Sequence, residues 1–192
     1  RILGGRVAPE YLVRVLPSLV QSKVARTVTL DGDLYQAING QSVTLTLVDE
    51  IDMLNAESEQ AHALTITGAS DSYRARQKLK YPDGTEVEAV GRAHVGGSTK
   101  YKSNHMTRER PVVIIRLSDY VYGDYELEFR VGGQVAGAYA QIAGSDRKHR
   151  WRNFHYEIPR GLVSASTIEI EQVAVTPGRD VNMFHYWFYQ PA

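Results

Sequence analysis

Hydrophobic and polar residues alternate one for one over several short stretches of this chain. In Tyr125–Val131, four apolar residues alternate with two glutamates and an arginine. Side chains of a β-strand point to opposite faces in turn, so this pattern predicts a strand with one buried face and one wet face. By the same rule Ile168, Ile170 and Val173 should point inward, with a bulge near Gln172 where the phase changes.

Stretches rich in Val, Ile, Thr, Tyr and Phe recur along the chain, separated by turn residues. Gly132-Gly133 and Pro177-Gly178 suit tight reversals, because glycine adopts positive φ without strain. The nearly continuous apolar run Val112–Leu117 predicts an interior strand. The predicted strands are Val24–Leu30, Ser42–Asp49, Ala63–Thr67, Ser72–Tyr81, Glu86–Val95, Pro111–Ser118, Asp124–Val131, Ala138–Ala143, Arg150–Ile158, Ser166–Thr176 and Asn182–Gln190.

Patterns typical of helices are scarce. Glu10–Leu16 is compatible with a short helix or a strand, and Ile51–Ala61 predicts one or two helical turns with Asp49 as the cap. Gly96–Asn104 predicts a mobile loop. Many short strands without long helices are typical of two packed antiparallel sheets. We therefore expect an all-β, antiparallel two-sheet sandwich, jelly-roll-like, with at most one or two short helices. It would span residues 24–192 and follow an N-terminal arm, residues 1–23.

Composition limits the class of protein further. A chain of 192 residues, 43% of them hydrophobic, is long enough to form one core without covalent cross-links. The absence of cysteine excludes disulfides and thiolate metal sites. No apolar run approaches the ~18 residues needed to cross a bilayer, so no membrane insertion is expected. The chain begins with Arg1 rather than Met, which indicates a processed product or a piece of a longer polypeptide.

The net charge is zero, but charge is unevenly placed. Between Thr27 and Tyr73 every Asp, Glu, Lys or Arg is acidic, whereas Arg74–Arg116 is mainly basic. The two segments could pair inside one fold, or the acidic side of one subunit could meet the basic side of a copy. Such complementarity sets partner choice and register more than affinity. The neutral total makes nucleic acid an unlikely partner, because nucleic-acid binding requires a basic footprint.

Two aromatic strands near the end of the chain carry the main candidates for a binding site. Alternation gives each strand one face with histidine, aromatic and hydrogen-bonding side chains. Such a face suits sugar, because flat rings cover the apolar side of a pyranose while Asn, His and Glu bond its hydroxyls. It would also suit a protein interface, and packing between sheets is the first of the three interpretations. The candidates are Trp151, Asn153, His155 and Glu157 on the first strand and His185, Trp187 and Tyr189 on the second.

The two tryptophans of the chain lie in these strands, and their neighbours differ. Trp187 stands among Phe184, Tyr186 and Phe188, which leave its strand no polar face, so we expect it to be buried. Trp151 stands between Arg150 and Arg152, which favours exposure.

Three short segments point to an enzymatic alternative for this chain. Gly137–Ala143 (Gly-Ala-Tyr-Ala-Gln-Ile-Ala), Arg108-Glu109-Arg110 and the Tyr-rich end resemble jelly-roll polysaccharide lyases. In that family an Arg/Glu-rich strand, a Gln-Ile-His strand and a Tyr-rich strand share one concave face. The resemblance implies a Tyr or His base and an Arg or Gln that neutralises the uronate carboxylate. However, Ala143 stands where the family has histidine. The corresponding residues would be Tyr139, Gln141, His155 and Arg116.

Other catalytic and metal-binding patterns are missing from the sequence. There is no H-E-x-x-H helix, no Gly-rich phosphate loop and no G-x-S-x-G elbow, so we expect no metal and no cofactor. We therefore expect a non-catalytic structural or attachment module of a larger assembly, of the virion, phage-tail or cell-surface appendage type. Its partners would be copies of itself or other subunits, at an extracellular or virion-surface location. The first alternative is a carbohydrate-binding module with a glycan partner, and the second is a polysaccharide lyase.

Overall fold

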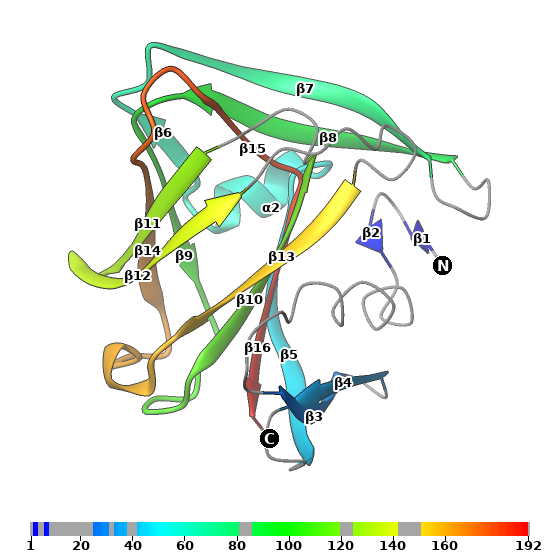
Figure 1. Ribbon diagram of the computed structural model, residues 1–192, viewed down its shortest axis with the longest axis vertical. Helices are drawn as coiled ribbons and strands as arrows, with labels where there is room; N and C mark the ends of the chain where they lie inside the picture. Colours follow the sequence, from blue (N-terminus) through cyan, green and yellow to red (C-terminus); the bar gives the residue numbers. More distant parts are fainter. Residues whose placement is uncertain are drawn as a thin grey trace.

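β-Strands dominate the computed structural model, which describes residues 2–3, 6–7, 25–30, 33–37, 42–80, 86–119, 125–141 and 151–191 (Figure 1). Of these residues, only α2 (Ala56–Ala61) and the 3₁₀ helix η2 (Arg160–Leu162) are helical. The strands are β1 (Ile2–Leu3), β2 (Arg6–Val7), β3 (Ala25–Leu30), β4 (Asp33–Ala37), β5 (Ser42–Asp52), β6 (Thr65–Thr67), β7 (Asp71–Lys80), β8 (Glu86–Val95), β9 (Ser98–Ser103), β10 (Val112–Asp119), β11 (Tyr125–Val131), β12 (Gln134–Gln141), β13 (Trp151–Ile158), β14 (Ile168–Ala174), β15 (Asp180–Met183) and β16 (His185–Pro191).

Two large sheets form the predicted sandwich. One has six strands in the order β13-β10-β16-β5-β3-β4, and the other has five in the order β12-β11-β14-β9-β6. Figure 1 shows them on opposite sides of the molecule, with the chain crossing repeatedly from one to the other as in a jelly roll. The described strand pairs are antiparallel except for β3 and β5, which run parallel. The all-β sandwich is thus confirmed, with one parallel pair next to the edge strand β4.

The core lies between these sheets, as strand alternation predicts. β11 buries every second residue from Tyr125 to Val131 and leaves its charged residues at the surface. β10 pairs with a strand on each side, which confirms the interior strand predicted from its apolar run. Tyr186 of β16 packs against Tyr101 of β9 with ring centroids 5.0 Å apart and ring planes tilted by 37°, so aromatic contacts join the two sheets directly.

A third sheet, β15-β8-β7, closes one end of the sandwich above α2 (Figure 1). The buried Glu59 of α2 fastens the helix to this sheet, because its Oε2 accepts hydrogen bonds from Arg74 and Arg92 at 2.7 Å. The short helix expected within Ile51–Ala61 is present. Its cap is Asn55 rather than Asp49, because β5 continues to Asp52 and Asn55 Oδ1 accepts from Glu57 N. Among the described residues no helix has the length and hydropathy to cross a membrane.

Two predictions about strands were wrong. The mobile loop expected over Gly96–Asn104 contains β9, whose residues Ser98, Thr99, Tyr101 and Ser103 are buried. Small hydroxyl side chains hid the alternation there. The bulge expected near Gln172 is also absent, since the register of β14 with β9 and β11 is continuous. Gln172 itself points inward, where its amide bonds the hydroxyls of Tyr101 and Tyr186.

The tight turn at Gly132-Gly133 is confirmed, with φ of 55° and 83°, and Gly178 also has a positive φ of 66°. Glu10–Leu16 lies outside the described residues, so the element expected there is untested.

Candidate functional site

The aromatic face of β16 is buried rather than open to a ligand. His185, Trp187 and Tyr189 are 0%, 3% and 1% exposed. The indole of Trp187 stacks on the imidazole of His185 with centroids 4.1 Å apart. An exposed sugar platform on this strand is therefore wrong, and the expected burial of Trp187 is confirmed.

Strand register nevertheless brings the two sets of candidate positions onto one sheet. β13 and β16 flank β10, where Ile115 pairs with both His155 and Trp187. Of the β13 candidates, Glu157 is exposed at the sheet edge. The side chains of Trp151, Asn153 and His155 lie outside the described part of the structure, so the exposure expected for Trp151 stays a prediction.

Of the residues that the lyase resemblance selected, Arg116 and His155 occupy positions on opposite faces of one sheet. Arg116 is 2% exposed and points into the core, where its Nη2 donates to the Tyr125 hydroxyl at 2.8 Å. Burial alone would lower its pKa, but neighbouring tyrosines raise it, so the guanidinium stays charged. His155 pairs with Ile115, one position out of phase with Arg116, so the two positions belong to opposite faces of the sheet. Tyr139 and Gln141 lie on the edge strand β12, and their side chains are outside the described part.

A pocket of about 360 Å³ opens where the β11–β12 turn meets η2 and the loop that leads to β14. Its volume falls within the range of small-molecule sites. Among its lining residues Val131 and Ile168 are apolar and buried, whereas Gln134, Ser164 and Glu169 are polar and exposed. The lining residues are Val131, Gly132, Gln134, Gly161, Leu162, Ser164, Thr167, Ile168 and Glu169.

Hydrogen bonds from a neighbouring loop fix one wall of this pocket. Met106 N donates to Ser166 O and Glu109 N donates to Val163 O, both at 2.9 Å. The Arg108 guanidinium also donates to Ser164 O at 2.6 Å. The 104–110 loop is held in turn by Gln190 of β16, which bonds both backbone groups of Thr107. The wall is therefore largely preorganised, which lowers the entropic cost of binding a ligand.

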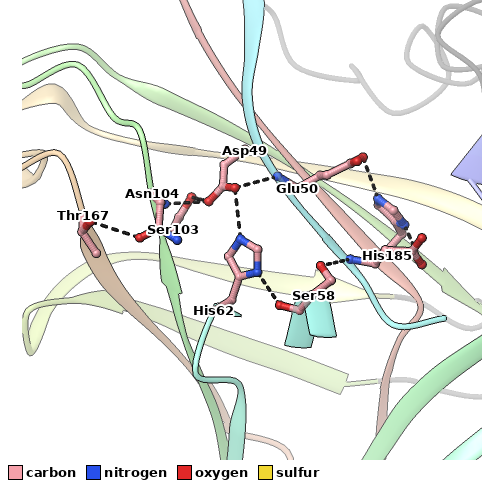
Figure 2. A network of polar contacts seen from close by, with 9 residues as sticks. Asp49, Glu50, Ser58, His62, Ser103, Asn104, Thr167 and His185 are labelled. Atoms are coloured by element: carbon pink, nitrogen blue, oxygen red, sulfur yellow. Dashed lines mark hydrogen bonds and ion pairs between the residues drawn. The ribbon is translucent and has the colours of Figure 1, made fainter. Parts of the chain in front are cut away.

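A network of polar contacts joins this loop to β5 and to the end of α2 (Figure 2). Asp49 of β5 is its centre. Its Oδ2 accepts from Ser103 Oγ at 3.1 Å and from Asn104 N at 2.6 Å, while its Oδ1 lies 3.0 Å from His62 Nε2. The other ring nitrogen of His62, Nδ1, lies 2.5 Å from Ser58 O. Carboxylate and carbonyl oxygens only accept hydrogen bonds, so both ring nitrogens must donate. Both contacts are hydrogen bonds when His62 carries a proton on each ring nitrogen, so the geometry favours the protonated imidazole.

The pKa values of this pair shift as the geometry demands. Burial would lower the pKa of His62, but its bonds to Asp49 and Ser58 and the negative charges of Asp49 and Glu50 raise it above its ordinary value. Burial would raise the pKa of Asp49, but hydrogen bonds from His62, Asn104 and Ser103 and the positive charge of His62 lower it. Each partner therefore favours the charged form of the other.

This ion pair predicts a pH-dependent contribution to stability. The His62 part is complete below about pH 6.5 and is lost as pH rises through the raised pKa of the folded state. The Asp49 part is complete above about pH 4 and is lost as pH falls through its lowered pKa. His62→Gln should therefore reduce the free energy of unfolding by about 1–3 kcal/mol near pH 5.5, and by less at higher pH. Urea denaturation across this pH range measures the difference.

His105→Asn provides the control, because His105 is exposed and asparagine tolerates its positive φ of 60°, so stability should change by less than about 0.5 kcal/mol. A difference between wild type and His62→Gln that does not change with pH would contradict the ion pair.

Neither the pocket nor this network could be found from sequence spacing. His62 is an isolated histidine in the sequence, and Asp49 reads as a helix cap. They meet because α2 folds back over β5. Ser103 at the end of β9 and the following Asn104 join them, 54 and 55 positions after Asp49. Among the described residues no group of three or more His, Asp or Glu side chains could hold a metal ion.

No family model matches the chain. Among solved structures it is similar to a carbohydrate-binding module from Cellvibrio mixtus lichenase 5A in complex with cellotriose, with 14% identity, a TM-score of 0.44, and coverage of 74% of this chain and 96% of that chain. A carbohydrate-binding module in complex with calcium and xylotriose has 13% identity and a TM-score of 0.43, with coverage of 72% and 98%. A family 35 module from Clostridium thermocellum has 12% identity and a TM-score of 0.42, with coverage of 65% and 96%. Likeness of this extent identifies neither a ligand nor a binding residue here.

Proposed function

We propose that this chain is a non-catalytic β-sandwich module that binds a glycan in the pocket between the β11–β12 turn and the η2–β14 loop. The observation that carries the proposal is the composition of the pocket lining, which combines exposed hydrogen-bonding residues with buried aliphatic ones. A sugar presents both hydroxyls and apolar C–H faces, so it matches both parts of such a site. An apolar ligand would leave the polar rim unpaired, which costs affinity.

The charge of the pocket narrows the class of glycan. Glu169 is the only ionisable residue among those that line it. A single carboxylate accepts hydrogen bonds from sugar hydroxyls but repels an acidic sugar, so the ligand is a neutral or amino-bearing glycan rather than a uronate. Hydrolysis of a glycoside ordinarily needs two carboxyl groups across the scissile bond. The pocket lining offers only one, so the proposal is binding without cleavage.

Binding of this kind also serves attachment. A module that holds a glycan anchors whatever larger assembly carries it to a glycan-bearing surface, which joins the two non-enzymatic functions expected from the sequence. None of the lining residues is aromatic. Affinity would therefore come from hydrogen bonds around one or two sugar units, without the stacking platform expected on β13 and β16.

Filling the pocket tests the proposal. A Cβ added to Gly161 would meet no atom within 4 Å, and its φ lies outside the left-handed region, so Gly161→Leu adds volume at the pocket without strain. We expect wild type to bind at least one member of a panel of neutral oligosaccharides that includes cellotriose and xylotriose. Gly161→Leu should weaken that binding about tenfold or more, equivalent to about 1.4 kcal/mol. Isothermal titration calorimetry measures both constants.

The matched control is Gly137→Leu. Gly137 also has open space for a Cβ, but it lies on β12 outside the pocket lining. The Gly137→Leu variant should bind the oligosaccharide with the same affinity as wild type. Equal weakening in both glycine variants, or binding that survives Gly161→Leu, would place the ligand elsewhere.

A further inference from the structure

Thr167 links the proposed glycan pocket to the buried ion pair. Its hydroxyl donates to Asn104 Oδ1 at 3.1 Å, and the Asn104 N–H donates to Asp49 Oδ2 at 2.6 Å. Asp49 in turn accepts from His62 through its other oxygen. Figure 2 shows these contacts in sequence, from the loop before β14 through the end of β9 to β5 and the end of α2. A continuous chain of hydrogen bonds therefore runs from the pocket wall to a titratable imidazole.

Loss of one proton would disturb this chain at its centre. A neutral imidazole can donate through only one nitrogen, so either the Asp49 or the Ser58 contact would set two lone pairs against each other. The same Asp49 carboxylate holds Ser103 and Asn104. If it turns away from His62, it must also change its bonds to the residues that bear on Thr167.

Left-handed backbone lies beside two members of this chain of contacts, His62 and Asn104. In the described part of the structure the non-glycine residues with positive φ are Ala63, His105 and Glu109, at 49°, 60° and 58°. Ala63 directly follows His62, and His105 directly follows Asn104. Glu109 lies in the same 104–110 loop as His105. Strained residues persist only where their surroundings hold them. Weaker contacts at Asp49 would therefore allow these loops, and with them the pocket wall at residues 164–168, to relax.

We propose that Asp49 is a positioning residue for the pocket and that protonated His62 holds it in place, so the pocket binds its ligand more tightly when His62 carries its proton. The binding part rests on the proposed glycan function. The coupling between His62 and the pocket wall does not, and it is testable without any ligand.

Other ionisable groups stand on the elements around this pair, so the pH effect must be traced to His62 itself. His185 lies on the opposite face of β5, with its Nε2 3.3 Å from Glu50 Oε2 and its Nδ1 3.6 Å from Asp52 Oδ1. His105 is exposed within the 104–110 loop. The remaining charged groups on β5, α2, β9, the loop and β14 are Glu50, Asp52, Glu57, Glu59, Lys100, Lys102, Arg108, Glu109, Arg110, Glu169 and Glu171.

Nuclear magnetic resonance of the whole chain without ligand tests the coupling. Imidazole signals report the titration of each histidine separately, and the amide signals of residues 164–168 report the pocket wall. Between about pH 5.5 and about pH 9, the wall signals should follow the titration curve of His62. They should not follow that of His185 or His105, and His105→Asn, which keeps a residue type that tolerates the positive φ there, should leave them unchanged.

A pair of variants at Thr167 separates the hydrogen bond from general effects on folding. Thr167→Ser keeps the hydroxyl and should keep the pH response of residues 164–168, whereas Thr167→Val removes the hydroxyl and should abolish it. Asn104→Ala should abolish it as well. The titration of His62 itself should persist in all three. A wall that responds equally in the Ser and Val variants would overturn the proposal.

Binding provides the second measurement. The Kd for the neutral oligosaccharide that binds best, with cellotriose as the first probe, should rise about fivefold from about pH 6 to about pH 9 in wild type. His62→Gln should bind with a Kd that does not change with pH. A pH-independent Kd in wild type would overturn the regulation of binding even if the wall signals titrate. If no oligosaccharide binds while the wall signals follow His62, the glycan function fails and the coupling stands.

Discussion

Replacing Trp187 with alanine should lower the free energy of unfolding by about 3–5 kcal/mol. Trp187 is 3% exposed and stacks on His185, which is itself fully buried between two acidic residues of β5. Removal of the indole would leave a cavity beside a buried imidazole, and both the lost contacts and the cavity are destabilising. Chemical denaturation followed by far-ultraviolet circular dichroism measures the change, because it does not depend on tryptophan emission.

Val135→Ala is the matched control, since Val135 is 59% exposed and should change stability by less than about 0.5 kcal/mol. Fluorescence provides an independent check. In a Trp151→Phe background the emission comes from Trp187 alone, and we expect it to be blue-shifted and protected from acrylamide. A loss of less than about 1 kcal/mol, with emission like that of free indole, would show that the aromatic face of β16 is open.

The strand pattern predicted most of the fold because alternation is a local property. β11 displays it in seven residues, and the structure buries the four residues that the pattern selects. The pattern failed where inward positions are polar. Gln172 is fully buried because the hydroxyls of Tyr101 and Tyr186 bond its amide, and those partners lie on two other strands. A glutamine that is paired in this way cannot be distinguished from a surface glutamine in the sequence.

The candidate site was less predictable for a related reason. Its parts come from the β11–β12 turn, η2 and the start of β14, and no segment has an unusual composition. The aromatic strands drew attention instead, because Trp and Tyr are common both in binding faces and in cores. Alternation correctly grouped His185, Trp187 and Tyr189 on one face of β16. Whether that face meets solvent depends on tertiary packing, which local sequence does not encode.

Gly97→Ala should be the most damaging single-methyl change in the β8–β9 region. Gly97 has φ of 72°, and a Cβ there would lie 2.3 Å from the carbonyl oxygen of Thr67 and 2.5 Å from Ala69 N. These are backbone atoms at the end of β6, which cannot rotate away as a side chain would. We expect a loss of about 2–5 kcal/mol, of which about 1–2 kcal/mol comes from the left-handed backbone and the rest from the forced separation of β6 and β9.

Gly96→Ala isolates the backbone contribution. Gly96 has nearly the same φ, 65°, but a Cβ there would meet no atom within 4 Å. Urea denaturation of both variants should therefore show a loss of about 1–2 kcal/mol for Gly96→Ala and a clearly larger loss for Gly97→Ala. Because Ser103 and Asn104 at the far end of β9 bond Asp49, a displaced β9 should also weaken the contact between Asp49 and His62. Equal losses in the two variants would mean that β6 can move away freely, and that the close approach of the two backbones contributes nothing to holding β9 in place.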